Sequence, residues 1–231
     1  MVDLRTLRLD SWETPATSYP EEEYRGWRIK RIRYNRGLYE MYGIDGHILF
    51  EATKPLQITT LQEKRGGKWH QWMVDDPPHW RAMQIYGEAV EGRVLSSGLG
   101  LGLFQHCIAK NPRVTQHTKI ERSAEVWALI WGQVPHNLNI TQMIIADLYN
   151  YIDFSHGIGE HWDWIMVDLW VARGAEEKLR IFWLEVLPTV AKLKTYWPEA
   201  KIIVHGFSNV SDVKLATPEA LERLEEFHSI E

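Results

Sequence analysis

Three carboxylates lie where an α/β protein could use them for chemistry. Glu121, Asp147 and Asp168 each follow a short apolar segment that is typical of a buried β-strand. Ligands of open α/β sheets bind beyond the carboxyl ends of the strands, so these side chains are candidate ligand contacts. Each acid alone could instead cap the next helix. The whole set favours a binding site.

A glycine-rich segment, Val94-Leu95-Ser96-Ser97-Gly98-Leu99-Gly100-Leu101-Gly102, precedes them in the chain. It is typical of a buried strand that turns into an apolar helix starting at Leu103. Glycine lets the backbone turn sharply and approach a ligand closely. Glu121 comes 19 residues after Gly102, near the spacing of about 20 at which an acid holds a ribose diol. A tight turn without a ligand is the alternative interpretation.

Bulk properties narrow the class of protein. The chain has 231 residues, 45% hydrophobic and 25% charged, with a net charge of −5. This charge gives no general attraction to nucleic acid or acidic membranes. The single cysteine, Cys107, excludes an internal disulfide and fits a reducing compartment. No apolar run approaches the roughly 20 residues of a membrane span, and the first residues do not form a signal peptide.

We therefore expect a cytoplasmic protein with a small-molecule partner, and neither a nucleic-acid nor a membrane partner. The oligomeric state stays open, and a homodimer is one arrangement that the sequence allows. A basic cluster from Arg25 to Arg36 could meet a phosphate. We interpret it instead as a solvated edge strand that charge protects from aggregation.

The chain divides into three regions. Residues 1–24 are expected to form a loosely attached arm, 25–74 a β-rich region, and 75–231 a Rossmann-like domain. Short segments separated by turn signals predict antiparallel hairpins in the β-rich region. The predicted strands are 26–34, 38–43, 47–53, 57–63 and 68–74.

Strands and helices alternate in the third region. Asp76 and Pro77 predict the start of a helix that ends near Val90. Such alternation predicts an α/β fold with a Rossmann-like, doubly wound, mostly parallel sheet. After the glycine turn the predicted strands are Val114–Ile120, Ile140–Ala146, Trp164–Val167 and Lys201–His205. The predicted helices are Ser123–Trp131, Ala175–Trp197 broken near Pro188, and Pro218–His228, and Leu148–Ile152 is a short stretch that is helical or looped.

Residues 90–206 resemble a class I S-adenosylmethionine (SAM)-dependent methyltransferase domain, which implies that the domain 75–231 binds SAM. The resemblance rests on the glycine segment as that family's first motif, on Glu121 as its ribose-binding acid and on Asp147 as the residue that meets the adenine amino group. Asp168 resembles the residue at the tip of the fourth strand, which often contributes to catalysis. The implied cofactor contacts are Ser96, Gly98, Leu99, Gly100, Gly102, Glu121, Arg122, Asp147 and Leu148.

Similarity is strongest to the spermidine-synthase-like branch, through Val114-Thr115…Ile120-Glu121 and Trp162–Asp168. That branch implies aminopropyl transfer from decarboxylated SAM as an alternative to methyl transfer. Leu101 and Val171 stand where that branch has aspartates, and Ser96 stands where many methyltransferases have an acid. Methyl transfer to a small molecule is the first hypothesis. A non-catalytic protein with this fold is the third.

Other residues are candidates for the acceptor side. Asp168 would orient or deprotonate the acceptor. Trp170, with Trp72 and Trp80, could form an aromatic wall for a cationic centre, although core packing is the alternative. His205 is a substrate contact or a core group, and Asp75 would close over the cofactor or cap a helix. His156-Gly157-Ile158-Gly159-Glu160-His161 lacks a third well-spaced ligand, so we expect no metal site.

Overall fold

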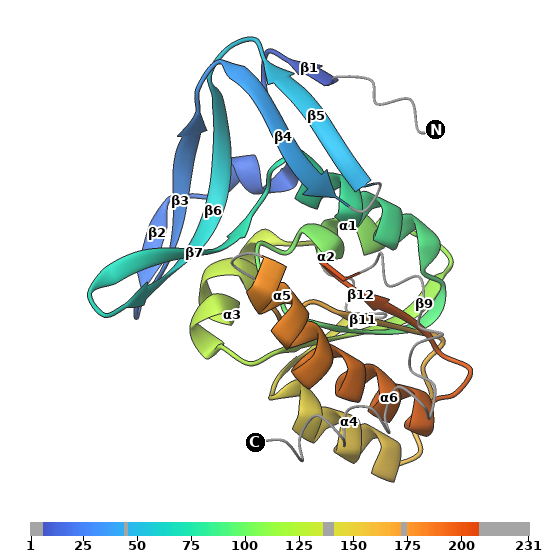
Figure 1. Ribbon diagram of the computed structural model, residues 1–231. Helices are drawn as coiled ribbons and strands as arrows, with labels where there is room; N and C mark the ends of the chain where they lie inside the picture. The colour runs from blue at the N-terminus through green and yellow to red at the C-terminus, as the bar shows by residue number, and fades with distance from the viewer. Residues whose placement is uncertain (1–6, 44–45, 136–140, 172–174, 208–231) are drawn as a thin grey trace.

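A five-stranded parallel sheet forms the centre of the molecule (Figure 1). The computed structural model describes residues 7–43, 46–135, 141–171 and 175–207. The sheet order is β10-β9-β8-β11-β12, so the strand of this sheet that comes first in the chain, β8, is central, and the later strands are added on both sides. This is the order of a doubly wound sheet and confirms the predicted α/β, Rossmann-like fold. The strands are β8 (Gly92–Ser97), β9 (Val114–Glu121), β10 (Thr141–Ile145), β11 (Trp164–Val167) and β12 (Lys201–Val204).

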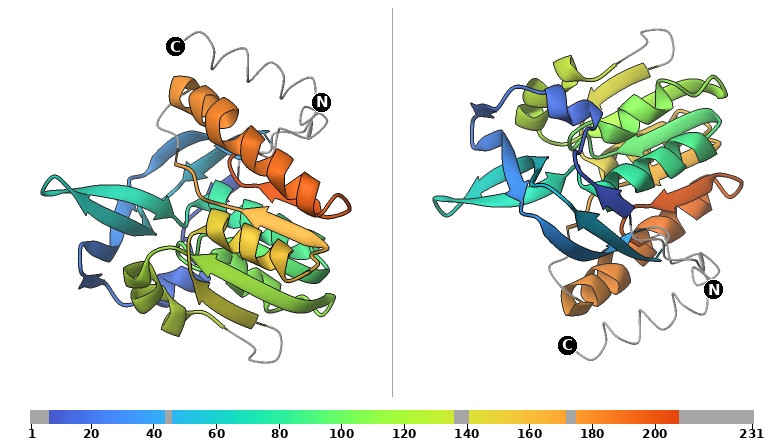
Figure 2. Two further views of the ribbon diagram at one scale, coloured as in Figure 1. Left: turned by 90° about the horizontal axis from the view of Figure 1, so that it is seen from below. Right: turned by 90° about the horizontal axis from the view of Figure 1, so that it is seen from above.

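Helices cover both faces of this sheet, and the antiparallel strands lie to one side of these layers (Figure 2). Alternation along β8 separates two cores, because neighbouring side chains of a strand point to opposite faces. Val94 packs with α1, α2 and α3, whereas Leu95 packs with α4 and α6. The helices are α1 (Pro77–Ala89), α2 (Leu103–Ile108), α3 (Ala124–Ile130), α4 (Leu148–Gly157), α5 (Ala175–Ile181) and α6 (Leu187–Tyr196), with 3-10 turns at Pro15–Ser18 and Trp131–Gln133.

The long helix predicted over Ala175–Trp197 is interrupted as expected. A π-helical segment, Phe182–Val186, joins α5 to α6 directly before Pro188. Proline lacks the N–H of a regular helical bond and its ring crowds the preceding turn, so a wider turn there relieves both problems. The predicted helix Pro218–His228 lies outside the described residues.

Two smaller sheets precede the parallel sheet, with orders β1-β5-β4 and β2-β3-β6-β7. The β4–β5 and β6–β7 hairpins are antiparallel, as predicted. β3 does not pair with β4, however, but runs antiparallel to β6. The strands are β1 (Leu7–Leu9), β2 (Glu22–Tyr24), β3 (Trp27–Tyr34), β4 (Gly37–Gly43), β5 (Gly46–Ala52), β6 (Leu56–Arg65) and β7 (Lys68–Val74).

The N-terminal segment is not the loosely attached arm that its composition suggested. Tyr19 is 1% exposed, and its hydroxyl lies 3.1 Å from the Leu101 carbonyl oxygen and 2.8 Å from His106 Nε2. Arg31 donates hydrogen bonds to the carbonyl oxygens of Thr17 and Tyr19. The buried Tyr19 side chain joins this segment to the glycine turn, and the Arg31 hydrogen bonds join it to β3.

Asp75 anchors the same segment instead of contacting a substrate. Its side chain is fully buried, and its two oxygens accept hydrogen bonds from the Thr59 N–H at 2.7 Å and the Thr14 hydroxyl at 2.5 Å. The Trp12 indole donates to the Asp75 carbonyl oxygen. Because this side chain has no exposed surface, a ligand cannot reach it, and the prediction that Asp75 is a substrate contact is wrong.

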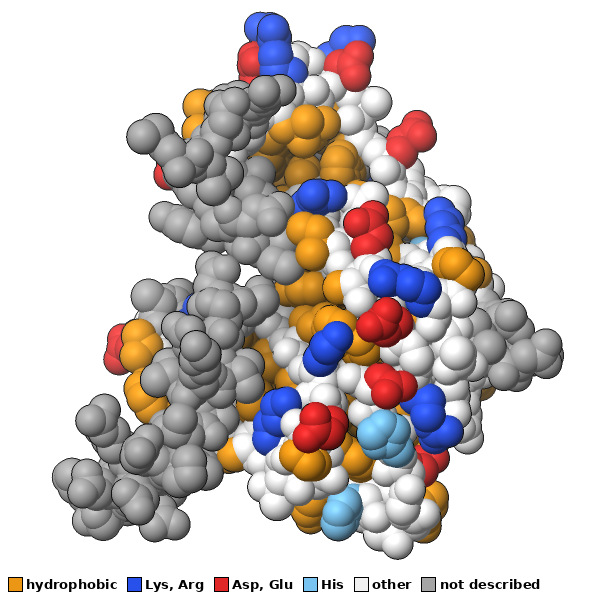
Figure 3. Space-filling model, turned by 90° about the vertical axis from the view of Figure 1, so that its right-hand side faces the viewer, with side chains coloured by type: hydrophobic (Ala, Val, Ile, Leu, Met, Phe, Trp, Pro, Cys, Tyr) orange, Lys and Arg blue, Asp and Glu red, His pale blue; other side chains and the backbone are white. Residues whose placement is uncertain are grey.

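The basic strand β3 is not the free edge strand that we expected. β6 pairs with it along its whole length, β2 covers Trp27–Ile29 on the other side, and several of its cations have partners within the molecule. Arg28 donates to Gln62 and stacks 4.2 Å from the Trp69 ring centroid, and Lys30 pairs with Glu21 at 2.6 Å. Acidic and basic side chains are interspersed among the described residues on the face shown in Figure 3. None of the described helices is both long and apolar enough to span a membrane.

Truncation of Tyr19 tests the attachment of the N-terminal segment. We expect Tyr19→Ala to lower the free energy of unfolding by about 3–5 kcal/mol, the usual cost of removing a buried aromatic side chain. Tyr24→Ala is the matched control, because Tyr24 is 38% exposed, and it should change stability by less than about 0.5 kcal/mol. Urea denaturation measures both. Equal small effects would show that the segment contributes nothing to the fold.

Candidate functional site

A cavity of about 280 Å³ lies at the carboxyl ends of the parallel strands. It gathers the predicted residues Gly98, Gly100, Glu121, Arg122, Asp147, Leu148, Asp168 and Trp170. The parallel sheet explains this meeting, since its strands all end at one edge. Further lining residues, which we did not predict as cavity contacts, include Met73, Ser97, Tyr149 and Glu185. Trp72 also lines it, as an aromatic wall requires.

The glycine turn fits closely against its surroundings. Gly98 has φ +77°, and a Cβ there would lie 2.0 Å from the Asp168 carbonyl oxygen. Gly100 has φ +53°, and a Cβ there would lie 2.2 Å from Met73 Sδ. Left-handed backbone and these close contacts both require glycine. The turn therefore brings its own backbone against β7 and the end of β11.

Glu121 joins the turn to the next helix. One carboxylate oxygen accepts the Leu99 N–H at 2.7 Å, and the other accepts the Ser123 N–H at 2.7 Å. Leu99 thus contributes its N–H to Glu121 and its side chain to the core. A carboxylate oxygen has two lone-pair directions, so Glu121 can still accept hydrogen bonds from a ligand.

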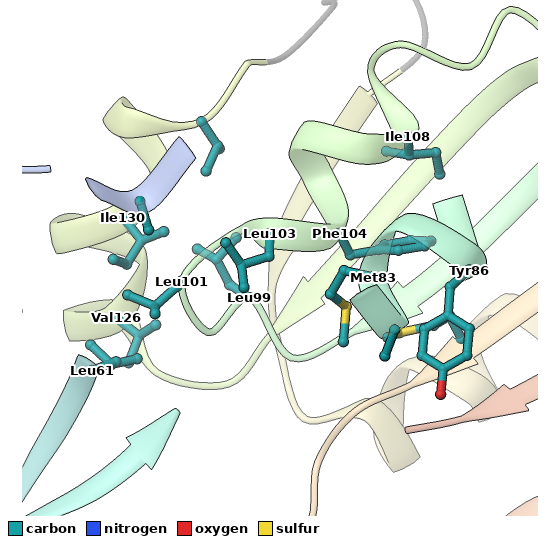
Figure 4. Close-up of a cluster of buried hydrophobic side chains, with 14 of the residues drawn as sticks. Leu61, Met83, Tyr86, Leu99, Leu101, Leu103, Phe104, Ile108, Val126 and Ile130 are labelled. Carbon is teal, nitrogen blue, oxygen red and sulfur yellow. The ribbon is translucent and has the colours of Figure 1, made fainter. Parts of the chain in front are cut away.

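Three leucines of the glycine turn and the start of α2 anchor this segment in the apolar core. Leu99, Leu101 and Leu103 pack in the core beside Val126 and Ile130 of α3 (Figure 4). Leu101 is fully buried there. The position that is an aspartate in spermidine synthases is therefore part of the apolar core in this chain.

Three predicted cofactor residues, Ser96, Leu99 and Gly102, lie outside the cavity lining. Ser96 is fully buried, and its hydroxyl lies 2.7 Å from His117 Nε2 on β9. Gly102 has φ +69° at the start of α2, where a Cβ would meet Val134. Alternation along β8 turns the next residue, Ser97, to the cavity instead. The Ser97 hydroxyl is buried without a hydrogen-bond partner among the described residues.

Asp147 and the residues after β11 complete the lining. Asp147 caps α4 by accepting the Tyr149 N–H at 2.9 Å, so the capping interpretation holds for this acid and does not exclude ligand contact. Trp170 donates its indole N–H to Glu185 at 2.7 Å. This bond fixes the ring at the edge of the cavity. A pair so distant in sequence leaves no local signal that could predict it.

A second cavity, of about 260 Å³, adjoins the first. Trp72, Met73, Asp168, Trp170 and Val171 line both. The second cavity also contains His205, as predicted, together with His79, Lys178 and Phe207. Two adjacent cavities that share a wall could hold two ligands side by side. Trp80 lines neither of these cavities and packs against the main core instead. The prediction that Trp80 belongs to the aromatic wall is therefore wrong.

A buried lysine lies behind the carboxylates. Lys119 of β9 is 1% exposed, and its ammonium lies 5.7 Å from the Phe104 ring centroid. Burial lowers the pKa of Lys119 to about 8, although the negative charges of Asp168 and Glu121 oppose this shift. The cation therefore balances part of the negative charge at the strand ends.

No group of three or more His, Cys, Asp or Glu residues in the described part of the chain is arranged to hold a metal ion. The side chains of the segment 156–161 are engaged otherwise. His156 stacks on Tyr196 with ring centroids 3.9 Å apart, and Glu160 accepts hydrogen bonds from Tyr151 and Ser155.

Fold and cavity together define a Rossmann-like α/β protein with a cavity at the carboxyl ends of its parallel strands. No protein-family model and no curated protein matches the chain. Among solved structures, it is similar to a protein from Streptococcus mutans provisionally assigned as a SAM-dependent methyltransferase, with 14% identity and a TM-score of 0.46 over 72% of this chain and 40% of the other.

Two further similar structures were solved with S-adenosylhomocysteine (SAH). One is SMU.776, a provisionally assigned methyltransferase, with 15% identity and a TM-score of 0.45 over 72% of this chain and 41% of the other. Human methyltransferase-like protein 13 shows 22% identity and a TM-score of 0.39 over 60% of this chain and 70% of the other. The chain thus spans about two fifths of the first two proteins.

Gly98→Ala tests the close approach of the turn to Asp168. The methyl group would meet the Asp168 carbonyl oxygen in left-handed backbone, so we expect a loss of more than about 2 kcal/mol in the free energy of unfolding. Gly157→Ala is the control, because a Cβ there meets nothing within 4 Å. Thermal and urea unfolding report both variants. Tolerance of Gly98→Ala would contradict the packing of this turn.

His117 should make the folded chain sensitive to acid. Burial is the main cause that lowers the pKa of His117 to about 3, and Lys119 adds to it. An unfolded histidine titrates near about 6.5, so below that pH the unfolded state binds a proton that the folded state refuses. Stability should therefore fall as the pH drops from about 6.5 toward about 3.

Between pH 7 and 5 this loss amounts to about 2 kcal/mol, at about 1.4 kcal/mol per pH unit. His117→Gln, which cannot titrate, should lack this part of the loss. Urea unfolding at both pH values measures it. An identical pH dependence in the variant would show that His117 titrates normally in the folded chain.

Proposed function

We propose that this chain is a SAM-dependent methyltransferase that acts on a small molecule. The observation that carries the proposal is the meeting of the glycine turn, Glu121, Asp147 and Asp168 in one cavity. The second cavity shares Asp168 with the first and offers room for an acceptor.

The lining of the first cavity fits the parts of SAM. Glu121 has lone pairs left for a ribose diol, and Asp147 with Leu148 is placed at the next strand end for the adenine ring. The Ser97 hydroxyl, which lines the cavity without a hydrogen-bond partner among the described residues, offers a polar contact beside the turn. Clustered carboxylates also suit a ligand that carries positive charge.

SAM would supply a methyl group activated by its sulfonium charge. The protein must then hold the acceptor in line with that methyl group and exclude water, which is mainly a matter of positioning. Trp72 and Trp170 lie at the boundary of both cavities and can stabilise a cation through their ring faces. Asp168, at the same boundary, would orient the acceptor.

Aminopropyl transfer is the less favoured chemistry for this site. A polyamine acceptor carries several positive charges and needs several carboxylates to hold them. Leu101 is buried in the core, and Val171 lines both cavities where an acid would be needed. The small-molecule partner, the cytoplasmic location and a homodimer stay predictions.

Calorimetry with SAM and SAH tests the proposed function. We expect micromolar binding to the wild-type chain. Glu121→Gln should weaken it by about 10- to 100-fold, because a hydrogen bond to a charged group contributes about 1.5–3 kcal/mol. Glu199→Gln, an exposed site beyond α6, is the control. A folded wild-type chain that binds neither compound would refute the proposal, and tighter binding of decarboxylated SAM would favour aminopropyl transfer.

A further inference from the structure

The second cavity contains a histidine–aspartate pair that the proposed methyl transfer has not yet used. His79 lines this cavity from the first turn of α1. Its Nδ1 lies 2.9 Å from Asp76 Oδ1, which also accepts the His79 backbone N–H at 3.2 Å. A carboxylate only accepts hydrogen bonds, so Nδ1 is the protonated nitrogen. A proton taken from a ligand must therefore go to Nε2.

The rest of the cavity has polar groups near His79 and flat apolar walls. The His205 ring lies 5.2 Å from the His79 ring, and its buried Nδ1 has no hydrogen-bond partner among the described residues. Trp72, Trp170 and Phe207 provide aromatic surface. Lys178 of α5 brings a positive charge, with its ammonium 5.5 Å from the Phe207 ring centroid.

We propose that His79, oriented by Asp76, is the catalytic base for the acceptor, and that the acceptor is a small aromatic molecule with an acidic hydroxyl and an anionic group. This inference rests on the proposed function. The aromatic walls would hold the ring, Lys178 the anionic group, and His79 the hydroxyl. The cavity volume of about 260 Å³ limits the acceptor to a small molecule.

The step balances without a further reactant. An acceptor oxygen forms a bond to the methyl carbon, and the carbon–sulfur bond breaks with its electron pair remaining on sulfur. The hydroxyl proton moves to His79 Nε2 and leaves later to water. Asp76 stabilises the imidazolium that forms.

Charged groups around His79 support its role. Burial disfavours the protonated ring, but the hydrogen bond to Asp76 and the charges of Asp76, Asp168 and Asp75 raise the pKa of His79 overall. His205 and Lys178 face the same cavity and are the neighbouring groups that can oppose this shift. A base with a raised pKa holds the transferred proton more strongly.

Methyl transfer to 4-hydroxybenzoate, with benzoate as the hydroxyl-free control, tests the proposal. We expect SAH to form with the first compound only, and His79→Gln to lower its rate of formation by about 100-fold or more. His161→Gln is the matched control, since that side chain is 62% exposed and remote from the cavity lining. Binding of SAH should be unchanged in both variants.

Nuclear magnetic resonance of carbon-13-labelled histidines gives a readout that is independent of turnover. Asp76→Asn keeps a good helix cap but removes the charge, so the pKa of His79 should fall by about one unit or more. The rings should also shift when 4-hydroxybenzoate binds. An unchanged titration would refute the dyad.

The outcomes separate the two proposals. Absence of SAH binding to the wild-type chain refutes the proposed function, whatever the histidine titration shows. Intact SAH binding with full transfer by His79→Gln refutes His79 as the base. Intact SAH binding without any binding of either benzoate refutes the proposed acceptor class.

Discussion

The paired hydrogen bonds to Glu121 are the constraint on which the site depends. They hold the Leu99 and Ser123 N–H groups at opposite oxygens of one carboxylate, and so fix the turn after β8 relative to the start of α3. Each N–H would otherwise be left without a partner, at a cost of about 1–3 kcal/mol if buried. The residue expected to hold a ligand therefore also builds the floor on which the ligand would lie.

Much of the fold follows from local patterns in the sequence. Apolar strands alternating with helices predict the parallel sheet, and the spacing from Gly102 to Glu121 places the acid beside the turn. Strand ends are the natural positions for Asp147 and Asp168, because parallel strands bring them to one edge. The pairing of β3 with β6 was not predictable from loop length, since the β4–β5 hairpin between them turns away to pair with β1.

Residues that only tertiary contacts define were missed or misplaced. Asp75 and Asp76 are neighbours with the same side chain, yet Asp75 is buried and bonded to Thr14 and Thr59, whereas Asp76 bonds to His79 at the second cavity. The Asp76–His79 spacing of three residues at a helix start is a local signal that could have been found. The Tyr19 contact with Leu101 and the Trp170 bond to Glu185 join distant segments and leave no such signal.

The charged side chains of the site are distributed unevenly between the two cavities. Glu121, Asp147, Asp168 and Glu185 gather around the first cavity, while Lys119 supplies a buried cation behind two of them. A cavity with more carboxylates than cations favours a positively charged ligand, in agreement with the sulfonium proposed above. The second cavity shares Asp168 with the first, but it adds one cation, Lys178, and two histidines. The acidic side chains of the first cavity and Lys178 of the second would place a cationic donor and an anionic acceptor on either side of Asp168, and their attraction would favour the meeting that group transfer requires.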